Sequence, residues 1–215
     1  MRIGYSTRYL LISCHNPEEP QFRGIREIAG RLERTKGFCH FTWTGEPQDL
    51  NRRRVLTWVL ISGHGSADFA RLGNNQNLFI NCQDIQLPPR AALYLLGCYQ
   101  GRSKLKKKWA QGSAIPESQV YGCPAETESA LSTCLLLQLL KHGPQTIEYW
   151  YREWLKTNKQ LKPHFPLLRR LYSLSAGDPV LTFNKLKGSI DMNPVMDFIK
   201  IALEYPQALS ELHGS

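Results

Sequence analysis

The sequence has no CxxC or HxxxH spacing, no long apolar run and no low-complexity tract. Its six cysteines are scattered in mostly apolar segments, so they indicate neither a disulfide framework nor a zinc site. The first apolar run, 9–12, is far shorter than the core of a signal peptide, and no segment approaches the roughly 18–20 apolar residues of a membrane span. We therefore expect a soluble, cytoplasmic protein that has no membrane partner and needs no metal or cofactor.

The length and charge narrow the class further. A chain of 215 residues, 42% apolar, fits one domain with a small appendage. We expect that domain over 1–188, with a helical extension over 189–215 packed on it. The formal net charge of +9 suits an acidic protein, a nucleic acid or an anionic lipid. The basic clusters lack the interleaved aromatics of a nucleic-acid stacking surface, Trp109 beside 104–108 excepted, so solvated helix faces explain them more simply.

Strand-like and helix-like segments alternate along the chain. Short apolar or β-branched runs predict strands at 8–13, 38–43, 54–62, 91–96, 119–121 and 180–183. Apolar residues at helical spacing predict helices around 25–32, 104–110, 129–141, 146–161 and 194–203. A turn is expected at 16–20, and a β-hairpin is expected at 69–72 and 78–80. This alternation is typical of an α/β fold: a three-layer αβα sandwich around a mostly parallel sheet of about six strands.

Two of the predicted strands end in a reactive side chain beside glycine. The run Val-Leu-Ile-Ser-Gly precedes His64, and Leu-Tyr-Leu-Leu-Gly precedes Cys98. Parallel α/β sheets keep their chemistry at the carboxyl ends of the strands, so the pattern predicts that both residues lie at that edge. Each residue alone has an ordinary structural explanation, as a turn histidine or an inert buried thiol. The repeated pattern favours a catalytic pair.

The pair has the chemistry of a cysteine hydrolase. A cysteine attacks a carbonyl as the thiolate, and a neutral imidazole accepts its proton near pH 7. We expect Cys98 to be the nucleophile and His64 the general acid/base. The backbone N–H groups of Gly65 and Cys98 are the natural donors to a tetrahedral oxyanion. The sequence identifies no third catalytic residue that would orient the histidine, so the prediction is a dyad of His64 and Cys98.

In these residues the chain resembles the caspase-like superfamily of cysteine peptidases, which includes caspases, legumain, gingipain, clostripain, separase and the CHAT domains. The resemblance covers roughly 8–185 and rests on the order strand, His-Gly, hairpin, strand, Cys, helix, strand. Cys-Tyr-Gln-Gly at 98–101 has glycine three places after the cysteine, as in CHAT domains and legumain. The resemblance implies the caspase-like form of the sandwich and assigns His64, Cys98 and Gly65 the roles given above.

The substrate pocket is less determined. Legumain and the clostripain group carry an acid two positions before the nucleophile, where this chain has Leu96. Glu126, after the fifth predicted strand, could supply an acidic pocket wall instead, although it also suits a helix N-terminus. Asp68 likewise has two interpretations, as a residue of the hairpin turn or as part of the wall of the cleft. The residue preferred before the scissile bond therefore stays open, with a basic residue slightly favoured.

Three classes of function compete. The first is a cysteine endopeptidase that cleaves a protein partner and, like CHAT-type proteins, answers to a regulatory protein. The second is a catalytically silent caspase-like scaffold that binds an acidic or nucleic-acid partner, although such a scaffold has no need of both His64 and Cys98. The third is an unrelated α/β hydrolase or amidotransferase with a cysteine nucleophile. Amidotransferases place the histidine after the cysteine, whereas here it comes first.

Overall fold

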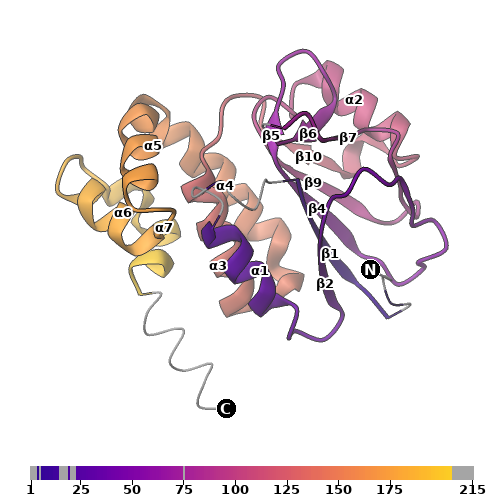
Figure 1. Cartoon of the computed structure of the whole chain (residues 1–215), viewed down its shortest axis with the longest axis horizontal. Helices are drawn as coiled ribbons and strands as arrows, with labels where there is room; N and C mark the ends of the chain where they lie inside the picture. The colour runs from indigo at the N-terminus through magenta and orange to yellow at the C-terminus, as the bar shows by residue number, and fades with distance from the viewer. Residues whose placement is uncertain (1–3, 5, 15–18, 20–22, 75, 205–215) are drawn as a thin grey trace. The chain divides into compact units, whose positions relative to one another are not determined.

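The computed structural model describes residues 4, 6–14, 19, 23–74 and 76–204 (Figure 1). The chain divides into two compact units. The sheet unit comprises residues 1–16 and 33–127, and the helical unit comprises residues 17–32 and 128–215. The turn predicted at 16–20 falls mostly outside the described residues.

The sheet unit is built on a five-stranded, wholly parallel sheet in the order β10-β9-β4-β1-β2 (Figure 1). The parallel α/β prediction is confirmed, but the sheet has five strands and not about six. The strands are β1 (Tyr9–Ser13), β2 (Phe38–Thr42), β4 (Trp58–Ser62), β9 (Ala92–Leu96) and β10 (Val120–Gly122).

Both faces of the three central strands, β1, β4 and β9, are buried, which explains why these strands are mostly apolar runs. All five residues of β4 are buried. Alternate residues of the central strands belong to one apolar core with the inner side of α2 (Ser103–Gly112), which contributes Leu105, Trp109 and Ala110. On the other face the ring of Trp58 contacts Tyr94 edge to face, and Tyr94 stacks on Tyr121.

Two small sheets complete this unit. One is the parallel pair β3 (Gln48–Asp49) and β8 (Ile85–Gln86), which the sequence pattern did not predict. The other is antiparallel and joins β5 (His64–Gly65), β6 (Arg71–Gly73) and β7 (Phe79–Asn81). The hairpin predicted at 69–72 and 78–80 is confirmed as β6 and β7. Its turn includes residue 75, which is outside the described part of the chain.

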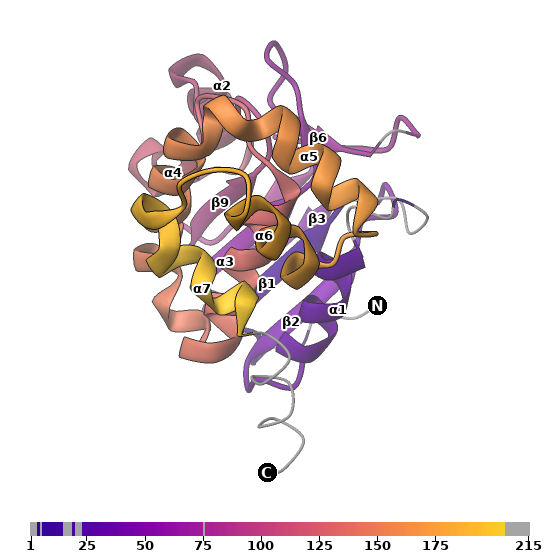
Figure 2. The same cartoon turned by 90° about the vertical axis from the view of Figure 1, so that its left-hand side faces the viewer.

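The helical unit contains α1 and the helices after residue 128 (Figure 2). Helix α3 is buried nearly all round and packs against α1, α4 and α7. The longer helices are α1 (Arg23–Leu32), α3 (Ser129–His142), α4 (Ile147–Leu161), α5 (Phe165–Leu174), α6 (Pro179–Lys187) and α7 (Met196–Leu203). Short 3₁₀ turns are η3 (Pro144–Thr146), η4 (Lys162–His164) and η5 (Asn193–Val195), and in the sheet unit η2 (Glu117–Gln119).

The sixth strand predicted at 180–183 is wrong, because this segment lies in α6. Asp178 caps the helix, its Oδ1 accepting a hydrogen bond of 3.0 Å from the N–H of Leu181. Pro179 occupies the first turn, where a missing N–H costs nothing. A four-residue apolar run cannot by itself distinguish strand from helix, and here the preceding Asp-Pro start signal decides it.

The segment predicted as an appendage, 189–215, is described only up to residue 204. Its helix α7 packs against α3 and α6 within the helical unit. Among the described residues no helix is long and apolar enough to cross a membrane.

The imidazole of His40 links two strands of the sheet and makes stability depend on pH. Its Nε2 lies 2.9 Å from Oγ of Ser13. Burial lowers the pKa of His40, and the nearby Glu33 opposes this only in part. Protonation therefore favours the unfolded chain, and stability falls as pH drops below the unfolded histidine pKa of about 6.5.

We expect the urea midpoint of the wild type to fall between pH 7.5 and pH 5.5 by more than that of His40→Gln. Equilibrium unfolding at both pH values measures the difference. Burial also lowers the pKa of His142, so His142→Gln is measured in the same way to separate the contribution of that histidine from that of His40. An equal fall in wild type and His40→Gln would contradict the assignment.

Candidate active site

The sheet register brings His64 and Cys98 to the same edge. Strands β4 and β9 are neighbours, and Ser62 is paired with Leu96. The N–H of Gly63 extends the ladder by one step, donating to the carbonyl of Leu96 at 3.2 Å. His64 and Cys98 each follow two residues after the paired positions. The predicted placement at the carboxyl ends of adjacent parallel strands is therefore what the structure has.

The backbones of the two segments are in close contact at Gly65. A Cβ atom on Gly65 would overlap the carbonyl oxygen of Cys98 and would lie 2.7 Å from the Cys98 nitrogen. No residue with a side chain fits there without displacing the backbone of the nucleophile segment. This close approach is a physical reason for glycine directly after His64.

Cys98 is half-buried and begins a tight turn. Tyr99, the next residue, has a φ of 66°, which is uncommon for a residue with a side chain. Its N–H donates to the carbonyl of Ala125 at 2.8 Å, which helps hold the turn. Among the described residues the N–H of Cys98 has no hydrogen-bond partner, so this predicted oxyanion donor is available.

The segment after β10 runs beside the cysteine. The N–H of Thr127 points at Sγ of Cys98 over 3.4 Å, and Oγ1 of Thr127 lies 3.8 Å from the same sulfur. An N–H donor binds an ionised acceptor more strongly than a neutral one, so this contact is strengthened when the sulfur is a thiolate. Thr127 was not predicted as a site residue, since threonine after a strand carries no distinctive signal.

The two acidic candidates lie in different loops of the sheet unit. Glu126 is exposed beside Thr127, and its Oε1 accepts a hydrogen bond of 2.9 Å from the hydroxyl of Tyr99. That hydrogen bond raises the pKa of Tyr99. Asp68 is exposed in the loop between β5 and β6, where its N–H donates to Oγ of Ser66 at 3.2 Å. The structure thus brings Glu126 to the nucleophile segment and Asp68 to the histidine loop.

The other thiols are less suited to nucleophilic chemistry. Cys14 follows β1 at the same edge of the sheet but is only 1% exposed. Burial raises the pKa of the Cys14, Cys39, Cys82 and Cys134 thiols. His15, which could flank Cys14, is outside the described residues. In the described part of the chain no cluster of three or more His, Cys, Asp or Glu could hold a metal ion.

Gln100, which the sequence did not single out, joins the two halves of the site. It is fully buried, and its Nε2 lies 2.9 Å from the carbonyl of Ser66 and 3.3 Å from those of Phe69 and Cys98. Its Oε1 accepts a hydrogen bond of 2.7 Å from Nε1 of Trp109. One amide thus connects the loop after His64, the turn at Cys98 and the core helix α2.

Comparison of the chain with protein-family models, with curated proteins and with solved structures finds no match.

Replacing Gln100 by leucine should destabilise the protein by about 1–3 kcal/mol for each buried polar group left without a partner. The indole N–H of Trp109 is the first such group. Urea unfolding measures the loss, and Gln111→Leu, at an exposed position of α2, is the control. Unchanged stability in Gln100→Leu would show that Gln100 does not hold the site together.

Proposed function

We propose that this protein is a cysteine endopeptidase of the caspase-like type that cleaves a protein substrate. The observation that carries the proposal is the pairing of β4 with β9, which brings His64 and the half-buried Cys98 to the carboxyl ends of neighbouring strands, with the backbone of Gly65 against that of Cys98. The resemblance to caspase-like peptidases, and to CHAT domains in motif layout, supports the same assignment. A regulatory protein partner belongs to this proposal.

The reaction follows from the chemistry of the two groups. His64 takes the proton of Cys98, and the sulfur attacks the peptide carbonyl carbon to give a tetrahedral oxyanion. The N–H groups of Cys98 and Gly65 are the proposed donors to that oxygen. As the C–N bond breaks, His64 gives its proton to the leaving amine. A water molecule deprotonated by His64 then attacks the thioester, and the sulfur leaves as the free enzyme is restored.

A basic residue before the scissile bond is the specificity that Glu126 would supply. Its carboxylate is exposed, and the neighbouring residue Thr127 contacts the nucleophilic sulfur. The hydroxyl of Tyr99 holds one carboxylate oxygen and leaves the other for a substrate cation. Asp68, in the loop after His64, is the second candidate for the pocket wall.

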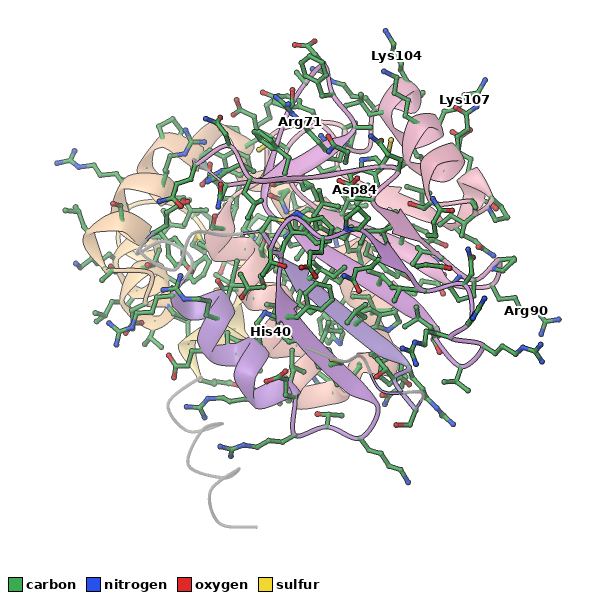
Figure 3. The ribbon with its side chains drawn as sticks, turned by 45° about the vertical axis from the view of Figure 1, so that its right-hand side comes forward. His40, Arg71, Asp84, Arg90, Lys104 and Lys107 are labelled. Carbon is green, nitrogen blue, oxygen red and sulfur yellow. The ribbon has the colours of Figure 1, made fainter. Side chains whose placement is uncertain are left out.

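A binding scaffold is the alternative, and one observation favours it. Lys104, Lys107 and Lys108 are exposed on α2, and Figure 3 shows Lys104 and Lys107 directed away from the protein. Such a row could contact an acidic protein or a nucleic-acid backbone. The endopeptidase is preferred because a scaffold requires neither the thiol nor the imidazole at the strand ends.

Cys98→Ala and His64→Ala should each lower peptide cleavage by about 10³-fold or more, because each removes the covalent route. A positional library of fluorogenic peptides provides the assay. Cys82→Ser, which changes a half-buried thiol elsewhere in the sheet unit, should retain turnover. Near-normal activity in either dyad variant would refute the assignment.

Glu126→Gln should weaken cleavage after Lys or Arg by about 1–3 kcal/mol and leave cleavage after uncharged residues nearly unchanged. The ratio of kcat/KM values for matched peptides measures the effect. Glu117→Gln, an exposed carboxylate on η2, is the control. Equal losses on basic and neutral peptides would mean that Glu126 supports the loop and does not contact substrate.

A further inference from the structure

Arg71 on β6 is held in an unusual environment beside the proposed dyad. Its guanidinium carbon lies 4.0 Å from the ring centroid of Phe79 and 4.6 Å from that of Phe69. Cation–aromatic contacts of this kind fix the plane of a guanidinium group. Phe69 itself is 54% exposed, which is uncommon for a phenylalanine that only fills a core.

The charge of Arg71 has no counter-ion within the described residues. Its Nε is buried and finds no hydrogen-bond acceptor there. A buried N–H without an acceptor is costly, and methionine or leucine would cover the same aromatic rings without that cost. Packing alone therefore does not account for arginine at this position.

The strand register places Arg71 on the same face as His64. His64 is paired with Gly73, so these two residues point to the same side of the small antiparallel sheet. Leu72 is fully buried and points to the opposite side, which puts Arg71 back on the side of His64. Arg71 is thus the diagonal neighbour of His64, a relation that long side chains can span.

Gly73, the residue directly opposite His64, has no side chain to separate the two groups. The ring of Phe79 occupies the space beside Gly73, since a Cβ there would overlap Cδ1 of that ring. Arg71 stacks on the same ring. The ring of Phe79 therefore lies between the position opposite His64 and the guanidinium group of Arg71.

Strand pairing brings a different charged residue to each member of the proposed dyad. Glu126 follows β10, Cys98 follows β9, His64 continues from β4, and Arg71 lies on β6. β10 and β4 are on either side of β9, and β6 pairs with β5, which carries His64. Arg71 therefore belongs to the strand that pairs with His64, and Glu126 follows the strand that pairs with the one before Cys98.

We propose that Arg71 is the subsite for a carboxylate side chain of the substrate, so that the enzyme selects peptides with Asp or Glu on the His64 side of the scissile bond. This inference rests on the proposed function. Guanidinium groups bind carboxylates through two parallel N–H donors, and stacking between rings leaves the edge of the group for that contact. An acceptor at this edge would supply the counter-ion that Arg71 lacks.

Two peptide libraries test the proposal, identical except that one has Asp and Glu where the other has Asn and Gln. We expect wild type to cleave the acidic members about 10–100-fold faster at one position beside the scissile bond. Arg71→Gln should remove this preference while still cleaving the amide members, and Arg71→Lys should keep part of it. Arg90→Gln, an exposed arginine of the sheet unit labelled in Figure 3, should behave as wild type. Cleavage by wild type without an acidic preference, or a preference that is unchanged in Arg71→Gln, would overturn the proposal.

A binding measurement separates this inference from the proposed activity. The fluorescein-labelled acidic and amide libraries are titrated against Cys98→Ala and against Cys98→Ala/Arg71→Gln, with urea midpoints to verify folding. If Cys98→Ala binds the acidic library about tenfold more tightly and the double variant does not, the Arg71 subsite is supported. This holds even if wild type cleaves no peptide, a result that would refute only the peptidase. No acidic preference in Cys98→Ala, or one that survives in the double variant, refutes the subsite.

Discussion

The parallel pairing of β4 with β9 is the constraint on which the proposed site depends. Because Ser62 and Leu96 are paired, His64 and Cys98 follow at equal distance from the last ladder positions. A register slip by one residue would turn the buried side chains of a strand to the opposite face, where the close-packed neighbours do not match their shapes. The apolar packing of both faces therefore fixes the position of the reactive groups.

Three features near this edge stabilise the turn at Cys98 against its own strain. Tyr99 has a left-handed backbone, a conformation that costs on the order of 1 kcal/mol or more for a non-glycine residue. The segment 123–127 offsets this cost, because its carbonyls accept two hydrogen bonds from the turn. The N–H of Tyr99 donates to Ala125, and the N–H of Gly101 donates to Cys123 at 2.8 Å. Gln100 adds the connection to α2 through Trp109. Cys98 is thereby held by the core and not by a free loop, as the proposed chemistry requires.

The sequence predicted the parts of this arrangement that depend on local apolar pattern. The strands ending before His64 and Cys98, the hairpin after β5 and the long helices α3 and α4 were all visible as periodic runs. The helix over 180–183 was not predicted, because a short apolar run is compatible with either strand or helix. The Asp-Pro start signal before it decides for the helix. The contacts of Gln100, Thr127 and Arg71 depend on residues distant in the sequence, so no local pattern could have indicated them.

The most direct measurement of the central claim is the rate at which iodoacetamide alkylates Cys98 in the folded protein at neutral pH, followed by peptide mass spectrometry. Thiolates react and thiols do not, so a base next to the sulfur raises the rate. We predict that Cys98 reacts fastest of the six cysteines and that His64→Ala slows its alkylation by about tenfold or more. A Cys98 rate that is unchanged in His64→Ala would contradict a functional dyad.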